Sequence, residues 1–308
     1  MSDDLDKISI DIHMDSVAEV LGFAEAMEDP CYYAVMDRFL RIADNRKFKL
    51  SIFVIGRELE DPRKFTRVGE WHDMGHEIGN HSYGHHVDLS QFDELACHDE
   101  VHRAHQLIEA ASGVTPVGFI SPGWGGSKSL WTVLSKLNYS YDTSVFPSWL
   151  MLPQYAFWVT QFFGNPRHRQ FLRRGFDVHR NLFASRQPFA FKGDGPKHLH
   201  VLPIPTTSYR VACWHSLAFY MNWNVYERLL RSALRSTRIF HYVMHVGDMF
   251  CTDDLDDPHF SRSMPRADRP VQEKIDMFNR VLDIFESEGK QITTTKNLVA
   301  EAFSEAKP

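Results

Sequence analysis

The sequence is poor in cysteine and has no long hydrophobic run. Its four cysteines, at positions 31, 97, 213 and 251, stand far apart and form no C-x-x-C pair. This spacing favours free, buried thiols in a reducing compartment over a disulfide framework. The first residues, MSDDLDKISI, contain neither the basic stretch nor the apolar run of a secretion signal or membrane anchor. We therefore expect a cytoplasmic protein.

A strong charge imbalance and internal repeats are also absent. The formal net charge of −6 gives no reason to expect nucleic acid as a partner. Hydrophobic residues make up 43% and charged residues 24% of the chain, which is typical of globular proteins. A length of 308 residues is long for an ordinary domain but normal for one α/β barrel. We expect residues 1–308 to form a single domain.

Short apolar runs alternate with segments of helical spacing nearly from end to end. Helical spacing is clear at positions 35, 39 and 42 and again from 271 to 285, and Ser127 is a candidate N-cap. Such alternation predicts parallel strands joined by helical crossovers. The expected strands are Ile8–Asp15, Leu50–Ile55, Glu77–Asn80, Val117–Ile120, Leu199–Ile204, Ile239–Met244 and Gln291–Thr294.

One face of the first expected strand is polar. Because side chains alternate along a strand, Ser9, Asp11, His13 and Asp15 share one face of the sequence ISIDIHMDS. Ionisable groups in a barrel interior are costly without a metal or a hydrogen-bonded network. The pattern therefore indicates either a functional site at the end of the strand or a polar edge strand that faces water.

A histidine pair follows the third expected strand. His81 and His85 lie four residues apart, directly after Glu77–Asn80. Two neutral imidazoles at that spacing can bind one ion, and a carboxylate such as Asp15 from a neighbouring strand can complete the site. Zn²⁺ accepts this set of ligands and keeps a position open for water.

Two further segments carry candidate catalytic groups. His245 ends an apolar run, with Asp248 three residues later, so it can serve as a general acid or else be a core histidine. The Gly-rich segment at Gly123 and Trp124 could direct backbone N–H groups at a developing oxyanion, or simply form a turn.

Together, these segments and their order resemble the NodB-type polysaccharide deacetylases, carbohydrate esterase family four. The resemblance runs across nearly the whole chain, and its most specific parts are NHSYGH at 80–85 and PVGF-x-x-PGW at 116–124. It implies a distorted (β/α)₇-like barrel that hydrolyses an acetamide on a sugar. It also implies a divalent ion on an Asp-His-His set, an aspartate base beside the metal aspartate, and a histidine acid late in the chain.

The resemblance assigns roles to individual residues. It places one ion on Asp15, His81 and His85, with zinc expected first and cobalt, nickel, manganese or iron as alternatives. It makes His245 the general acid. Substrate and oxyanion contacts fall at the turn that contains Gly123 and Trp124.

Two positions depart from the family pattern. The family's aspartate base falls on His13, and its supporting arginine falls on Ile120. An imidazole base does not need a cationic partner, so the two changes are mutually consistent. His13 could be the base, oriented by Asp11 as in other Asp-His pairs. Alternatively, His13 binds the metal, or the protein is a catalytically silent carbohydrate-binding homologue.

The segment from about 148 to 197 interrupts the alternation and is too long for a βα loop. We expect an insertion that covers or flanks the site. It is rich in phenylalanine and arginine, and Arg173 and Arg174 are candidate phosphate ligands. Such a segment can also contact an anionic membrane surface, or be only a solvated lid. Its arginines between 167 and 186 are Arg167, Arg169, Arg173, Arg174, Arg180 and Arg186.

The expected substrate is therefore an N-acetylated sugar or glycan precursor, nucleotide- or lipid-linked, in surface polysaccharide synthesis. Hydrolysis of a non-sugar amide is the competing enzymatic hypothesis, since related barrels also open cyclic amides. The sequence leaves the oligomeric state open.

Overall fold

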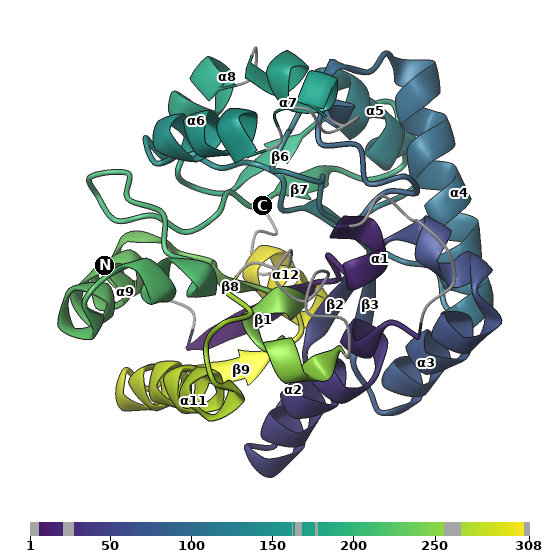
Figure 1. Ribbon diagram of the computed structural model, residues 1–308. Coiled ribbons are helices and arrows are strands. Elements are labelled where there is room, and N and C mark those ends of the chain that lie inside the picture. Colours follow the sequence, from purple (N-terminus) through teal and green to yellow (C-terminus); the bar gives the residue numbers. More distant parts are fainter. Residues whose placement is uncertain are drawn as a thin grey trace.

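A curled, mostly parallel sheet lies at the centre of the protein in a computed structural model that describes residues 6–20, 28–161, 163, 168–175, 178–255 and 266–304 (Figure 1). The strand order is β6-β7-β5-β4-β3-β2-β1-β8, and β9 also pairs with β1. Only the β6–β7 pairing is antiparallel among these strands. The strands are β1 (Lys7–His13), β2 (Ser51–Val54), β3 (Glu77–Asn80), β4 (Gly118–Phe119), β5 (Tyr141–Asp142), β6 (Phe189–Phe191), β7 (Leu199–Val201), β8 (Phe240–His245) and β9 (Gln291–Thr293).

The predicted distorted α/β barrel is confirmed as a curled half-barrel. All seven strands expected from the sequence are present, most of them shorter than the apolar runs that predicted them. The sequence analysis missed β5 and β6, which are two and three residues long and too short to show an alternating pattern. The four cysteines are free and buried, as expected. No helix among the described residues is long and apolar enough to span a membrane.

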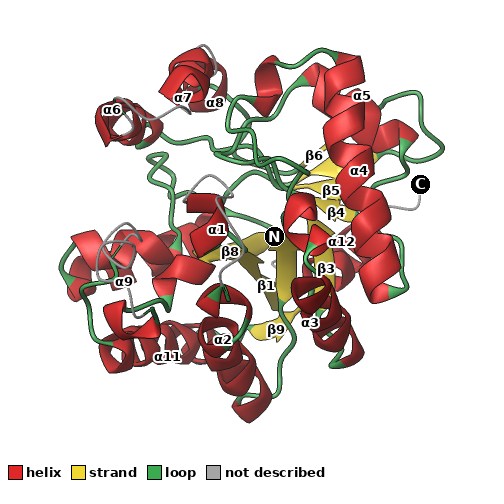
Figure 2. Cartoon of the chain, turned by 45° about the vertical axis from the view of Figure 1, so that its right-hand side comes forward, coloured by secondary structure: helices red, strands yellow, loops and turns green. Residues whose placement is uncertain are grey.

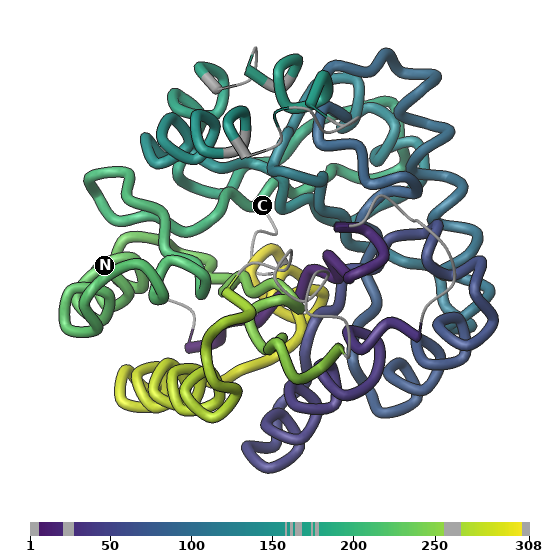
Figure 3. Tube along the Cα trace, viewed as in Figure 1, coloured from purple at the N-terminus to yellow at the C-terminus, as the bar shows by residue number. Residues whose placement is uncertain are grey.

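The first strand pairs with three other strands, although it lies second from one end of the strand order. Along one edge, β1 pairs with β8 over Ile8–His13. Its other edge is divided, because Lys7–Ser9 pair with β9 and Asp11–His13 pair with β2. The first and last strands of the chain thus lie side by side, and Figure 3 shows the purple first strand beside the yellow last one. Every residue from Ile8 to His13 is buried.

Amphipathic helices surround the sheet (Figure 2). Several begin at side chains that accept backbone N–H groups, and each such cap is typically worth about 1 kcal/mol. Asp61 accepts from Arg63, and the predicted cap Ser127 accepts from Leu130. The surrounding helices are α2 (Ala34–Asn45), α3 (Pro62–Asp73), α4 (Glu94–Ser112), α5 (Lys128–Lys136), α9 (Trp223–Ser236) and α11 (Val271–Ser287).

The last helix, α12 (Thr295–Ser304), begins at the amino ends of the central strands. The backbone N–H of Thr295 donates to Ser51 Oγ, and that of Lys296 donates to the Glu77 carboxylate. Ser51 and Glu77 are the first residues of β2 and β3. The N-terminus of α12 therefore closes this end of the half-barrel with hydrogen bonds. Burial raises the pKa of Glu77, and the N–H of Lys296 offsets part of this effect.

In the described part of the insertion, the chain forms three short helices and β6. The helices are α6 (Met151–Gln161), α7 (His168–Arg174) and α8 (Val178–Leu182). They lie together at the top of Figure 1, and α6 packs against both α7 and α8. Gln170 lies 3.2 Å from His86, and Asn181 donates to the carbonyl of Trp124. The insertion therefore flanks the loops that follow β3 and β4.

Candidate metal centre and active site

The end of β1 delivers a carboxylate to the edge of the sheet. The N–H of Met14 donates to the carbonyl of Phe53 at 3.0 Å, so the chain stays extended one residue beyond β1. Asp15 follows, and the short helix α1 (Val17–Val20) begins two residues later. The Asp15 side chain is 27% exposed, whereas His13 is buried. Asp15 is thus held at the mouth of the half-barrel.

The loop after β3 turns two histidines toward Asp15. Asn80 accepts the N–H of Ser82, and Ser82 Oγ accepts the N–H of His85. Ser82 and His85 have φ angles of 62° and 52°. Non-glycine residues rarely adopt this left-handed conformation, and strained backbone of this kind is concentrated at functional sites. The tight loop lets His81 and His85 reach the same point.

The three predicted ligands are brought together. Asp15 Oδ1 lies 3.3 Å from His81 Nε2 and 3.1 Å from His85 Nε2. One ligand atom from each of the three residues lies within 4.8 Å of the other two. Four-coordinate catalytic zinc sites use such a set of two imidazoles and one carboxylate. The donor types therefore fit a single divalent ion.

Each histidine is oriented through its other ring nitrogen. His81 Nδ1 lies 2.8 Å from the carbonyl of Ile120, so it donates there and leaves Nε2 without a proton. His85 Nδ1 lies 2.7 Å from the Glu19 carboxylate on α1. Carbonyl or carboxylate partners of this kind usually fix the tautomer of metal-binding histidines. Ile120, at the position of the family's arginine, is buried and contributes its backbone oxygen.

The charges at the site favour a cation. Burial alone would raise the pKa of Asp15, but the rings of His81 and His85 outweigh it and hold that pKa well below its usual value. Burial lowers the pKa of His81. Burial also opposes protonation of His85, yet the negative charges of Glu19 and Asp15 raise its pKa to about 9. In the absence of an ion, a proton on His85 therefore supplies the positive charge that the two carboxylates attract.

His13 and His245 lie side by side next to the three ligands. They are register partners on β1 and β8, with ring centroids 5.0 Å apart. Among the residues that the structure describes, His13 Nε2 has no hydrogen-bond partner. Burial lowers the pKa of His13 well below its usual value, and His245 and His81 lower it further. A neutral ring with an unprotonated nitrogen is the form that can accept a proton.

The hypothesis that Asp11 orients His13 is wrong, because the Asp11 carboxylate has other partners. Its carboxylate lies 3.0 Å from His241 Nδ1 and accepts the hydroxyl of Thr295. Both partners are fully buried, as Asp11 is. Asp11 belongs to the closed network at the amino end of the half-barrel. The strand pattern could not reveal this, because both partners come from the last third of the chain.

Ser216, which the sequence analysis missed, links the predicted general acid His245 to Asp248. His245 Nδ1 lies 3.4 Å from Ser216 Oγ, and Ser216 donates to Asp248 Oδ1 at 2.8 Å. Asp248 Oδ2 accepts the backbone N–H of His245, and Arg266 pairs with the same carboxylate at 2.7 Å. His245 Nε2 lies 3.7 Å from Asp15 Oδ2. Nothing in the spacing of Ser216, Arg266 or Glu19 pointed to the site.

Trp124 forms a wall of the site, and its backbone N–H is not available for an oxyanion. That N–H donates to the carbonyl of Ser121 at 3.1 Å, and Gly123 takes a φ of 64° in the same turn. The indole ring lies 5.7 Å from the ring of His245 and 4.8 Å from that of Phe146. The predicted backbone contribution of Trp124 is therefore wrong for this conformation.

Of the two candidate phosphate ligands, Arg173 has a side chain that the structure describes. Arg173 Nη1 lies 3.2 Å from Asp88, and its side chain is 57% exposed. Arg174 ends α7, and its side chain lies outside the described part of the chain, as does Arg167.

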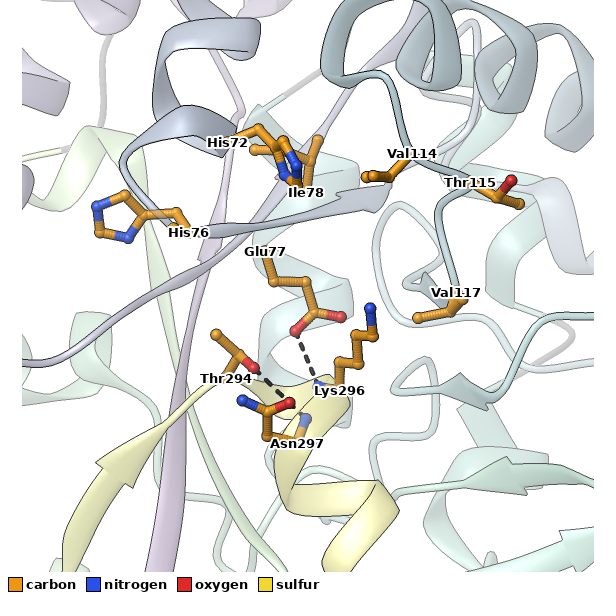
Figure 4. Close-up of a pocket in the computed structure, with 11 residues that line it drawn as sticks. His72, His76, Glu77, Ile78, Val114, Thr115, Val117, Thr294, Lys296 and Asn297 are labelled. Carbon is orange, nitrogen blue, oxygen red and sulfur yellow. Dashed lines mark hydrogen bonds between the residues drawn. The ribbon is translucent and has the colours of Figure 1, made fainter.

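A pocket at the opposite end of β3 is separate from these groups (Figure 4). Glu77 and Lys296 line it, together with His72 and Asn297. In the close-up, Glu77 accepts the backbone N–H of Lys296, and Thr294 accepts that of Asn297. These polar groups hold α12 in place, so the pocket belongs to the closed end of the half-barrel.

Known proteins share this fold. Residues 28–141 match the family described as polysaccharide deacetylase. A Mycobacterium smegmatis protein assigned as a polysaccharide deacetylase superposes with a TM-score of 0.62 at 15% identity, covering 98% of this chain and 91% of the other. No curated protein matches the sequence.

Two other structures are similar at TM-scores below 0.5. One is a carbohydrate esterase family 4 pseudoenzyme from Bacillus anthracis, with a TM-score of 0.49, 12% identity, and coverage of 97% of this chain and 66% of the other. The other is a family 4 acetyl xylan esterase from Clostridium thermocellum in complex with cobalt, with a TM-score of 0.45, 13% identity, and coverage of 97% and 90%.

The matched segment 28–141 contains both candidate metal histidines and the Trp124 turn. The similarity to the mycobacterial structure extends the common fold over almost the entire chain. The match of residues 28–141 to the polysaccharide deacetylase family and the shared fold agree with the resemblance to the NodB-type deacetylases seen in the motifs.

Proposed function

We propose that the protein is a metal-dependent hydrolase that removes an N-acetyl group from a sugar. The observation that carries the proposal is the convergence of Asp15, His81 and His85 on one point. The hydrogen bond from His81 to Ile120 and the Glu19 contact of His85 support it, because they leave both Nε2 atoms directed at Asp15. A zinc ion bound there would polarise the acetyl carbonyl and acidify a water molecule.

The histidines divide the proton transfers. His13, neutral and buried beside His81, accepts the proton of the attacking water. His245 donates a proton to the leaving amine of the sugar. Asp248 stabilises the protonated His245 through Ser216 and holds its backbone in place. The two proton-transfer groups are adjacent on β1 and β8, so they can act on one substrate without a large movement.

An aromatic cluster forms an apolar wall beside the two histidines. Trp124, Phe146 and Trp214 have ring centroids 4.8 to 6.2 Å apart, and Trp124 also borders His13 and His245. The three rings are buried and pack on one another, so they hold Trp124 in place beside the site. The adjoining arginine-rich insertion favours a nucleotide- or lipid-linked precursor, in a cytoplasmic step of surface polysaccharide synthesis.

The proposal is tested by acetate release from a panel of N-acetylated sugars, free, nucleotide-linked and lipid-linked, with a cyclic ureide as the non-sugar amide. Metal-stripped protein should be inactive and should recover activity with zinc, whereas His81→Ala should not recover. If the protein hydrolyses only the ureide, its substrate is a non-sugar amide and not an N-acetylated sugar. Metal binding without turnover of any substrate would identify a silent carbohydrate-binding homologue.

A further inference from the structure

The surface of the insertion is unusually apolar. Six of the large apolar side chains that are exposed in the described part of the chain lie within residues 149–183. Phe157 and Phe183 are 56% and 80% exposed. Scattered exposed apolar residues are normal, but a concentration of large ones marks a contact surface. We call this set the cap face: Trp149, Leu152, Phe157, Phe163, Leu172 and Phe183.

Helix α6 has an exposed stripe without charge. The helix contains no charged residue, although an exposed helix face in a globular protein is normally polar. Tyr155 donates to the carbonyl of Leu172, which joins α6 to α7. The described exposed positions follow helical spacing along one side: Leu152, Pro153, Ala156, Phe157 and Thr160.

The cap face is bordered by positive charge. Exposed arginines at 169, 173 and 180 stand on α7 and α8, and Asp177 is the only acidic residue of the sequence between 148 and 186. The chain as a whole has a net charge of −6, so the insertion is a basic region on an acidic protein. Aromatic and aliphatic groups bordered by arginine are typical of helices that lie in the interface of an anionic membrane.

The cap face adjoins the candidate active site. Arg173 pairs with Asp88, and Gln170 contacts His86 in the loop that carries the metal histidines. Asn181 on α8 accepts the N–H of Phe146 and donates to the carbonyl of Trp124. A surface that covers the cap face therefore lies beside the mouth of the half-barrel.

We propose that the cap face docks on an anionic lipid surface, with its apolar side chains in the interface and its arginines against the headgroups. A second copy of this chain fits less well. In a symmetric dimer through this face, the arginines of the two copies would face and repel one another. The inference goes beyond the proposed deacetylation and does not depend on it, since lipid binding is measured without turnover.

Flotation with phosphatidylcholine vesicles, with and without phosphatidylglycerol, tests the proposal. The full-length protein should float with the anionic vesicles and not with the neutral ones, and high salt should weaken binding. Phe157→Ser with Phe183→Ser should lower the bound-to-free ratio at least about tenfold. Leu95→Ser with Val225→Ser changes exposed apolar residues on α4 and α9, outside the cap face, and should bind like wild type. Thermal melting confirms that each variant is folded.

A second pair of variants separates the two parts of the surface. Arg169→Glu with Arg180→Glu should lower anionic binding by about tenfold or more, whereas Arg228→Glu with Arg235→Glu on α9 should have a much smaller effect. Absence of wild-type flotation would overturn the proposal. If the arginine variants lose binding to anionic vesicles while the phenylalanine variants bind fully, the proposal is also overturned and a polyanion site is indicated. A wild-type dimer that dissociates in the phenylalanine variants would overturn the proposal as well.

Discussion

Two parts of the polar face of β1 use the same alternating pattern in opposite ways. Toward the closed end of the half-barrel, Asp11 is fully buried and hydrogen-bonded to His241 and Thr295. At the carboxyl end, His13 Nε2 has no partner among the described residues, and Asp15 is partly exposed between two imidazoles. One end is a closed network that stabilises the half-barrel, and the other is built to receive a ligand.

The difference comes from what covers each end. The N-terminus of α12 supplies backbone N–H groups and a hydroxyl to the amino end, so its carboxylates are satisfied. The carboxyl end is surrounded by loops whose histidines turn toward Asp15. A polar strand face therefore indicates function only where nothing else in the fold satisfies it.

Replacing the two aspartates should separate stability from ligand binding. Asp11→Ala leaves His241 and Thr295 without their buried partner and should lower the free energy of unfolding by about 3 kcal/mol. Asp15→Ala should lower it by less without metal, because Asp15 is partly exposed and its two histidine partners lie at the open mouth of the half-barrel. Urea unfolding of metal-stripped proteins measures both values. Equal losses in the free energy of unfolding would show that Asp11 and Asp15 contribute equally to stability, contrary to this account.

The carboxylate behind His85 should control metal affinity. Glu19→Gln keeps the shape of the side chain but removes the charge that orients His85 Nδ1. We expect zinc affinity to fall by about 10- to 100-fold with the fold unchanged. Calorimetric titration measures this effect, and Glu301→Gln, at an exposed pair with Lys7, serves as the matched control.

The closed end should make the fold sensitive to acid. His76 Nδ1 accepts the N–H of Leu50, and burial lowers the pKa of His76 to about 4. Because its folded pKa lies below the unfolded value near 6.5, the stability it contributes is present above pH 6.5 and is lost as pH falls toward 4. We expect a loss of about 2 kcal/mol over this window. In His76→Gln, the free energy of unfolding should depend less steeply on pH between 4 and 6.5. If that slope is unchanged, groups other than His76 cause the acid sensitivity.

The smallest expected effect concerns Ser216. Ser216→Ala removes the hydroxyl between His245 and Asp248 but leaves the backbone contact of Asp248 intact. We expect kcat to fall about tenfold with KM and bound metal unchanged. Ser216→Thr keeps a hydroxyl and should restore much of the rate. A change in KM alone would indicate a substrate contact and not support of the acid.

The sequence was informative where function depends on short segments. The alternation of β1 placed Asp15 at a strand end, and the spacing of His81 and His85 predicted a shared ion. It was uninformative where function depends on distant elements. Ser216 reaches His245 across 29 residues and Asp11 reaches Thr295 across 284, and no local pattern encodes such contacts.

The turn at Trp124 shows a second limit of sequence reasoning. A Pro-Gly segment predicts a turn well, but whether its N–H groups face a ligand or close the turn depends on the backbone conformation. Here the N–H of Trp124 closes the turn and its ring faces His245. The structure places the ring of Trp124 beside the candidate site, whereas its backbone N–H does not face that site.

Zinc titration of three metal-stripped proteins tests the central contrast most directly. Wild type and Asp11→Asn should each bind one ion with similar affinity, since Asp11 belongs to the closed end. Asp15→Asn should lose most of that affinity, because it removes the only carboxylate among the three converging ligands. Undiminished binding by Asp15→Asn, or loss of binding by a folded Asp11→Asn, would contradict the assignment of the two ends.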